Sequence, residues 1–305
     1  MKIQRAEPTA PGAPRVEAPA SGSGKASSVA DRGPERDALM RRLADRYQRL
    51  LDLARTTLDG RTGWFPGKSL SAAHPAHATN TREQFEAALK KGANLFEGDI
   101  RAELDPPHAL EMRHDPTSEK GDNLTLDEWL AIGALSGRMM KLDVKEPGRM
   151  PDVIRAVRAS GIDPQRVMLN LDFKAMQRWG PELREAFPAA TLALNPPAPA
   201  SGPLTEAHVR DLLKQASTVG APLTFVIRHD RLTPQALSEL QRVAPVSVWN
   251  ASNGPAVGDP KAVAADLRKQ GVQGVIDISR TPGIKDKVLG ALERARQEIL
   301  TRLFH

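Results

Sequence analysis

Two carboxylates lie where a buried strand should carry apolar side chains, in the segment Asn94–Ile100. Side chains alternate between the two faces of a strand, so Glu97 and Asp99 point to the same side, two residues apart. Two neighbouring anions repel each other and lose hydration when buried, and they persist where a cation lies between them. The segment therefore predicts a cation site, in which the cation is either a metal ion or a basic side chain.

Charged or amide residues recur where the other predicted strands end. They are His77 with Asn80, His114 with Asp115, Asp143 with Lys145, Asn170 with Asp172, Asn195, Arg228 with His229, and Trp249 with Asn250. A single charged strand end is usually a solvated one, and Asp143 with Lys145 alone is compatible with a plain ion pair. The recurrence on successive strands instead predicts one composite site.

These residue types suit phosphodiester cleavage. Glu97, Asp99 and Asp143 are the hard oxygen ligands that Mg²⁺ or Ca²⁺ requires. The pair His77 and His114 suits general acid and base work near neutral pH. The residues assigned to phosphate or substrate binding are Lys145, Asn80, Arg228 and Asn250. Glycoside hydrolysis ranks lower, because its paired carboxylates flank a scissile bond instead of sharing one strand face.

Composition limits the classes of function. The 305 residues contain no cysteine, which excludes thiolate metal sites and cysteine nucleophiles, so any metal chemistry uses oxygen and nitrogen ligands. The net charge of +6 favours anionic partners such as phosphates, while the 4% of aromatic residues argues against a nucleic-acid partner. A small phosphodiester or a lipid head group is the expected partner, and peripheral membrane contact is compatible with it.

Three regions follow from the patterning. Residues 1–35 are rich in Pro, Ala, Gly and Ser and are expected to be disordered, either as an inert extension or as an export address resembling bacterial type III effector leaders. Residues 36–60 predict an amphipathic helix that caps the main domain or contacts a membrane or partner. Residues 61–305 form the main domain. No secretory signal or membrane-spanning run is found, so a cytoplasmic or tail-exported protein is expected.

The main domain alternates strand-like and helix-like segments, which predicts a closed (β/α)8 TIM barrel. The expected strands are 70–76, 94–100, 139–144, 167–171, 190–194, 223–228, 246–250 and 274–278, with an extra strand at 109–113. The expected helices are 82–91, 126–135, 151–159, 175–186, 205–216, 234–242, 260–269 and 285–303. A doubly wound open sheet is the alternative, but no glycine-rich phosphate loop follows the first strand.

The order of these motifs resembles the phospholipase C-like phosphodiesterase barrel superfamily, which includes the glycerophosphodiester phosphodiesterases. The shared motifs are a first-strand histidine (His77), Gly-Ala-x-x-x-Glu-x-Asp (residues 92–99), a His-Asp pair (114–115) and acid-x-Lys (143–145). The glycerophosphodiester phosphodiesterases carry His-Arg-Gly at the first strand. This chain has His77-Ala78-Thr79 there, which argues against glycerophosphodiester specificity.

The form His-x-x-Asn at 77–80, with residues 123–130 and 141–145, is more similar to the menorin family and to spider-venom sphingomyelinase D-type phospholipases. The venom-type resemblance implies His77 and His114 as the acid/base pair, Glu97, Asp99 and Asp143 as Mg²⁺ ligands, and Lys145 and Trp249 near the phosphate. The expected function is a metal-dependent phosphodiesterase acting on a glycerophosphodiester or (lyso)phospholipid-like substrate. The alternative is a catalytically silent barrel that binds a phosphorylated ligand or a host partner, as a secreted bacterial effector would.

Overall fold

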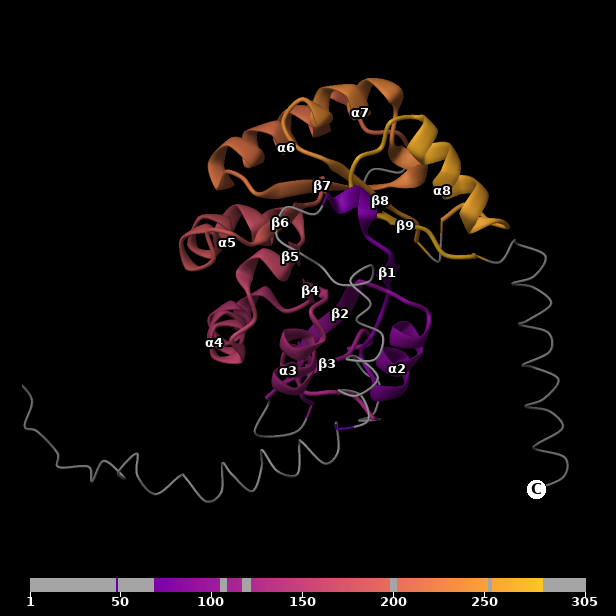
Figure 1. Ribbon diagram of the computed structural model, residues 1–305. Helices are drawn as coiled ribbons and strands as arrows, with labels where there is room; N and C mark the ends of the chain where they lie inside the picture. Colours follow the sequence, from indigo (N-terminus) through magenta and orange to yellow (C-terminus); the bar gives the residue numbers. More distant parts are fainter. Residues whose placement is uncertain are drawn as a thin grey trace, which may run out of the picture. The chain divides into compact units, whose positions relative to one another are not determined.

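The fold is described from a computed structural model, which covers residues 48, 69–104, 109–116, 122–197, 202–251 and 254–281 (Figure 1). Gln48 lies in a helix. The predicted tail, most of the predicted amphipathic helix and the predicted helix at 285–303 lie outside these residues. Within them, no helix is both long enough and apolar enough to cross a lipid bilayer.

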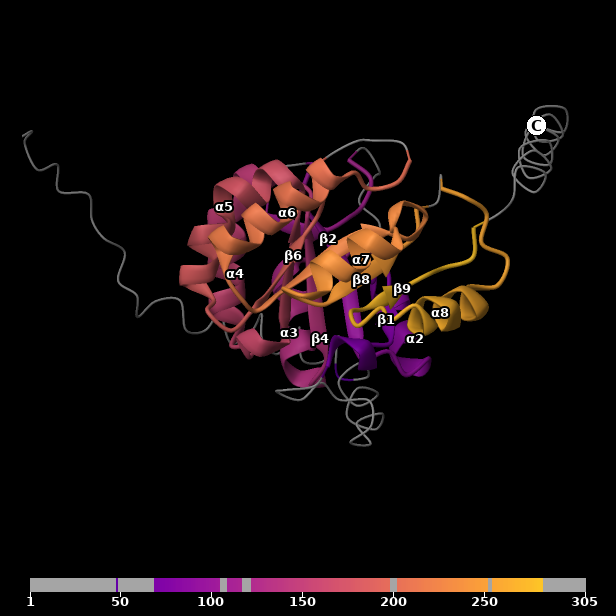
Figure 2. The same cartoon turned by 90° about the horizontal axis from the view of Figure 1, so that it is seen from above.

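Eight parallel strands form a nearly closed barrel, which confirms the predicted fold (Figures 1 and 2). Their order is β1-β2-β4-β5-β6-β7-β8-β9. The bounds are β1 Pro75–Ala76, β2 Leu95–Ala102, β4 Met139–Val144, β5 Val167–Leu171, β6 Thr191–Leu194, β7 Leu223–Arg228, β8 Val246–Trp249 and β9 Ile276–Asp277. The extra strand, β3 (Leu110–Met112), pairs antiparallel with β2.

The first and last strands lie side by side at the seam of the barrel in both views (Figures 1 and 2). Among the described residues, no strand pairing joins β1 to β9. Side chains link this seam instead. At the amino-terminal end of the strands, the guanidinium of Arg268 donates to the carbonyl of Ser71 at 3.0 Å. At the carboxyl-terminal end of the strands, His77 and Asp277 link the seam, and they belong to the candidate site described below.

Helices follow the strands and surround the barrel (Figure 2). They are α2 Arg82–Lys90, α3 Leu126–Ser136, α4 Met150–Ser160, α5 Phe173–Ala186, α6 Glu206–Val219, α7 Pro234–Gln241 and α8 Pro260–Lys269. Capping boxes begin α2, α3 and α6, where the side chain of Thr81, Thr125 or Thr205 accepts from the third residue of its helix. These caps satisfy amide donors that would otherwise lack partners.

An apolar layer fills the part of the barrel interior near the amino-terminal ends of the strands. It consists of Ala73, Leu95, Met139, Met168, Ala193, Val226 and Val275, with Leu70 and Trp249 packed against it. Because strand side chains alternate, the residue two positions further along each strand points into the interior above this layer. The barrel therefore has an apolar floor, and its upper layer is polar.

The start of the domain differs from the sequence prediction. A strand was expected over residues 70–76, but Leu70–Ala72 forms a 3₁₀ turn and β1 is only two residues long. The side chain of Ser69 caps this turn by accepting from the amide of Ser71. Pro75 has no amide hydrogen to contribute to a ladder, which limits the strand. The other observed strands lie within about two residues of their predicted bounds.

Candidate functional site at the barrel mouth

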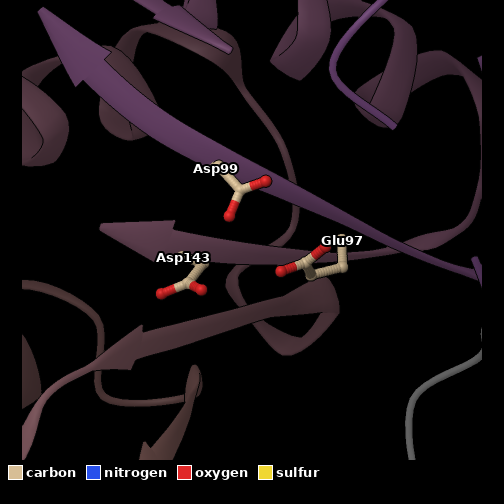
Figure 3. Close-up of side chains that lie close together, drawn as sticks. All are labelled: Glu97, Asp99 and Asp143. Atoms are coloured by element: carbon tan, nitrogen blue, oxygen red, sulfur yellow. The ribbon is translucent and has the colours of Figure 1, made fainter. Parts of the chain in front are cut away.

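Three acids converge where the neighbouring strands β2 and β4 run side by side (Figure 3). Glu97 and Asp99 lie on β2, and Asp143 on β4 is the register partner of Asp99. Each side chain offers one oxygen such that all three oxygens lie within 4.8 Å of one another. The structure thus brings the three predicted metal ligands together.

Glu97 is held from one side only. Its side chain is 1% exposed, and its Oε2 accepts a hydrogen bond from the amide of Ala78 at 2.7 Å. Its Oε1 is buried and has no hydrogen-bond partner. Burial raises the pKa of Glu97, although the charges of Lys141 and His77 oppose that effect. An unpartnered buried carboxylate oxygen is costly, so this atom marks a place where a cation is expected.

Asp99 is surrounded by donors. Asn80 holds it twice, because its Nδ2 donates to Oδ2 of Asp99 at 2.9 Å and its Oδ1 accepts from the Asp99 amide at 2.9 Å. Lys145 Nζ lies 2.9 Å from Oδ1 of Asp99. Burial acts to raise the pKa of Asp99, but Lys145 and Asn80 outweigh it and the pKa is lowered. Asn80, predicted as a substrate-binding residue, therefore holds a predicted metal ligand in this structure.

Asp143 connects Lys145 to an amide network. Its Oδ2 lies 2.6 Å from Lys145 Nζ, and its Oδ1 accepts from Nδ2 of Asn170 at 2.9 Å. Asn170 in turn accepts from Asn195 Nδ2 at 2.8 Å. Although burial opposes it, the charges of Asp143 and Asp99 raise the pKa of Lys145, so this residue is an ammonium at neutral pH. The amide of Asn170 on β5 thus orients Asp143, and Asn195, just after β6, holds Asn170.

His77 binds the same cluster from the loop after β1. Its Nδ1 lies 3.2 Å from Oε2 of Glu97 and 3.3 Å from Oδ2 of Asp277, while 55% of its side chain is exposed. The hydrogen bond with Asp277 is the main cause that raises the pKa of His77 to about 9, and the charge of Glu97 adds to it. His77 is therefore protonated at neutral pH when no metal is bound.

His114 follows β3 and is exposed. Its backbone is fixed beside the acids, because the amide of Arg113 donates to the carbonyl of Asp99 at 2.7 Å and Arg101 Nε donates to the carbonyl of His114 at 2.9 Å. The charge of His114 contributes to the lowered pKa of Asp99. Among the described residues, the His114 ring makes no hydrogen bond or ion pair with the three acids, so it stands free at the mouth.

The loop that carries His77 is tightly held. The amide and hydroxyl of Thr79 donate to the carbonyl of Glu97 at 2.7 and 2.8 Å, and Trp129 Nε1 donates to the carbonyl of Thr79 at 2.9 Å. Trp129 packs on Gly98, where an added Cβ would lie 2.3 Å from Met112 and 3.0 Å from Trp129. Ala78 adopts a φ of 53°, which is unusual for a residue with a side chain. That conformation directs its amide at Glu97.

Three other predicted residues make their own local contacts. Arg228 at the end of β7 pairs with both oxygens of Asp230, at 2.5 and 2.9 Å. Asn250 exchanges hydrogen bonds with the backbone of Ser279, each of 2.8 Å. Trp249 packs on the apolar floor of the barrel. Their roles in substrate binding remain predictions, and none of the three has a hydrogen bond or ion pair with the acidic cluster among the described residues.

Two charged residues of the cluster had no role in the sequence prediction. Lys141 was noted on the same strand face as Asp143, and it lies opposite Glu97 in the ladder. Burial acts to lower the pKa of Lys141, but Glu97, Asp143 and Asp277 outweigh it and raise the pKa. Asp277, on β9, was missed altogether. An acid at the end of a predicted strand was the available signal, the same that identified Asp143.

The donor set fits a hard divalent ion. Carboxylate oxygens are the ligands of Mg²⁺ and Ca²⁺, and two oxygens on opposite sides of such an ion lie about 4 to 5 Å apart, in line with the 4.8 Å spread. The unpartnered Oε1 of Glu97 is the atom such an ion would satisfy. Glu97, Asp99 and Asp143 would hold it, with Lys145 already compensating part of their charge.

The fold and the site together define a (β/α)8 barrel with an acidic cluster at the carboxyl end of its strands. The Menorin N-terminal domain family matches residues 70–253, more than half of the chain. The protein therefore belongs to the menorin family. The match begins at the first turn of the barrel and includes every described strand except β9.

Several solved structures of enzymes show similarity to this chain at low sequence identity. Phosphoribosyl anthranilate isomerase from Thermococcus kodakaraensis is 14% identical with a TM-score of 0.39, covering 70% of this chain and 93% of that one. A tryptophan synthase alpha-subunit mutant from Pyrococcus furiosus is 16% identical with a TM-score of 0.41, covering 67% and 85%. DAHP synthase from Thermotoga maritima is 12% identical with a TM-score of 0.44, covering 75% and 68%.

Proposed function

We propose that this barrel is a metal-dependent phosphodiesterase that acts on a glycerophosphodiester or lysophospholipid-like substrate. The observation that supports it best is the convergence of Glu97, Asp99 and Asp143 within 4.8 Å, with Oε1 of Glu97 lacking a partner. A histidine attached to this cluster through Glu97 adds the proton chemistry that phosphodiester cleavage needs.

Each group has a distinct task in this proposal. A divalent ion, when bound by the three acids, supplies positive charge to the phosphate. The ammonium of Lys145 can neutralise a further phosphate oxygen, because it is held at the mouth by Asp99 and Asp143. Nδ1 of His77 faces the carboxylates of Glu97 and Asp277, which leaves Nε2 to protonate a leaving alkoxide. His114, exposed and unpaired with the acids, suits the activation of the attacking oxygen.

The test is cleavage of glycerophosphocholine and lysophosphatidylcholine by the purified full-length protein with Mg²⁺ or Ca²⁺, followed by ³¹P NMR. The NMR spectrum also separates a hydrolysed product from a cyclic phosphate. His77→Ala and His114→Ala should each lower the rate by on the order of 10² or more. His74→Ala is the matched control, because His74 is exposed and precedes β1 at the opposite end of the barrel. Full activity in both site variants would refute the assignment.

A catalytically silent barrel that binds a phosphorylated ligand is the second candidate. Its support is the ammonium of Lys145, which already bridges two of the three acids, together with Ala78-Thr79 in place of the Arg-Gly pair of the resembling enzymes. Calorimetry with inorganic phosphate and glycerophosphocholine would then give binding heats, while ³¹P NMR gives no product. Steady turnover of glycerophosphocholine or lysophosphatidylcholine would exclude this candidate.

A further inference from the structure

The acid Asp277 joins the last strand of the barrel to the loop after the first. It lies on β9 beside Trp249 of β8 in the ladder, and its Oδ2 is 3.3 Å from Nδ1 of His77. Only 19% of its side chain is exposed. Because no strand pairing was found between β1 and β9 in the described residues, this contact links the barrel seam at the mouth.

Two carboxylates share one nitrogen of His77. Nδ1 lies 3.2 Å from Oε2 of Glu97 and 3.3 Å from Oδ2 of Asp277. A nitrogen that faces two carboxylates carries the proton and donates it to them, so the other ring nitrogen, Nε2, is left for exchange with a substrate. The half-exposed ring is thus oriented by its Nδ1 edge.

Glu97 cannot orient the ring alone. The same Oε2 already accepts from the amide of Ala78 at 2.7 Å, and Glu97 is one of the three acids that converge on the cation position. Asp277 is not one of these three acids, so its contact with His77 does not depend on whether a cation is bound between them. Lys141 lies within electrostatic range of Asp277 and favours its charged form.

We propose that Asp277 is a positioning residue, which holds Nδ1 of His77 so that Nε2 faces the substrate. The role rests on the proposed phosphodiesterase function, in which Nε2 of His77 gives its proton to the leaving oxygen. A carboxylate that binds one nitrogen of a histidine fixes the tautomer and orientation of the ring, and around metal-ligating histidines the loss of such a partner lowers metal affinity or activity by about 10- to 100-fold.

The first measurement does not need activity. In metal-free, ¹⁵N-histidine-labelled protein, the proton on Nδ1 of His77 should give an observable NMR signal, assigned by its loss in His77→Ala. Asp277→Ala should abolish it by exposing Nδ1 to water, and Asp277→Asn should retain it, because the amide oxygen can still accept this proton. An unchanged signal in Asp277→Ala would overturn the proposal.

The second measurement is kinetic. Asp277→Ala should lower kcat on glycerophosphocholine by about 10- to 100-fold with little change in KM. It should lower kcat much less on bis(p-nitrophenyl) phosphate, whose leaving group needs no proton. Combined with His77→Ala it should cause no further loss, because residues that act as a unit are not additive. Asp266→Ala, which removes an exposed acid on α8, is the matched control and should keep wild-type rates.

The outcomes separate the two claims. Equal losses on both substrates, or a further loss in the double variant, would show that Asp277 supports the structure of the whole site and not His77 in particular. Either result would overturn its positioning role. If the wild type cleaves neither diester, the proposed function fails, while the Nδ1 signal still decides whether Asp277 holds His77. Melting temperatures within a few degrees of the wild type show that each variant is folded.

Discussion

Lys145 and Asp99 form an ion pair at the barrel mouth, with Nζ 2.9 Å from Oδ1. The same ammonium lies 2.6 Å from Oδ2 of Asp143, so one built-in cation serves two of the three acids. A divalent ion that uses Asp99 and Asp143 must share their oxygens with this ammonium or displace it. Lys145 is therefore expected to weaken metal binding while it strengthens phosphate binding.

Replacing Lys145 by methionine should separate these two effects. Without the competing charge, the Kd of Ca²⁺ or Mg²⁺ measured by calorimetry should fall by about tenfold, which corresponds to about 1.4 kcal/mol. The rate of diester cleavage should fall by tenfold or more, because the phosphate loses a charged partner. Lys174→Met, at an exposed position on α5, is the control. Equal or weaker metal binding by Lys145→Met would contradict the competition.

The stability of the metal-free protein should depend on the protonation of His77. Its pKa is raised to about 9 by the hydrogen bond with Asp277, and by the charge of Glu97, against an ordinary value of 6.5. A raised pKa in the folded state adds stability fully below pH 6.5, and this stability is lost as pH rises through about 9. Urea unfolding across this range should show the loss in wild type and a weaker dependence in His77→Ala. Parallel curves for the two proteins would contradict it.

Gly98 separates Glu97 from Asp99 and should not tolerate a side chain. An added Cβ would lie 2.3 Å from Cε of Met112 and 3.0 Å from the Trp129 ring, and the ring is held in place by its hydrogen bond to Thr79. Gly98→Ala should lower the free energy of unfolding by about 1 to 3 kcal/mol through overpacking. Gly148→Ala, where an added Cβ meets nothing within 4 Å, is the comparison. Similar unfolding curves for both would refute the packing argument.

Ala78 should tolerate glycine better than a branched residue. Its φ of 53° costs an L-residue about 1 to 2 kcal/mol, and glycine avoids this cost at the expense of greater freedom in the unfolded chain. Ala78→Gly should therefore be neutral or slightly stabilising. Ala78→Val should destabilise by more than 1 kcal/mol and weaken the amide bond to Glu97. Thermal unfolding of both variants measures this, and a more stable valine variant would contradict it.

Local pattern was sufficient to predict the barrel and the group of three acids. Strand alternation places Glu97 and Asp99 on one face, and the carboxyl ends of parallel strands meet at one edge, so Asp143 was expected beside them. These inferences need only the period of a strand and the rule that joins successive strands. The strand β1 is shorter than predicted because the side chain of Ser69 caps a 3₁₀ turn and Pro75 has no amide hydrogen for the ladder. A strand period does not record such effects of single residues.

The partners within the site were decided by the tertiary structure. Asp277 reaches His77 because barrel closure brings together strands about 200 residues apart in the chain, and no local period records that meeting. Arg228 pairs with Asp230, and Asn80 with Asp99, because side-chain torsions and the geometry of the loops select one partner among several charged neighbours. The sequence by itself determined that Glu97, Asp99 and Asp143 gather at the mouth of the barrel. Only the folded chain decided which atom of each group holds its neighbour, and which atoms, such as Oε1 of Glu97, remain for a ligand.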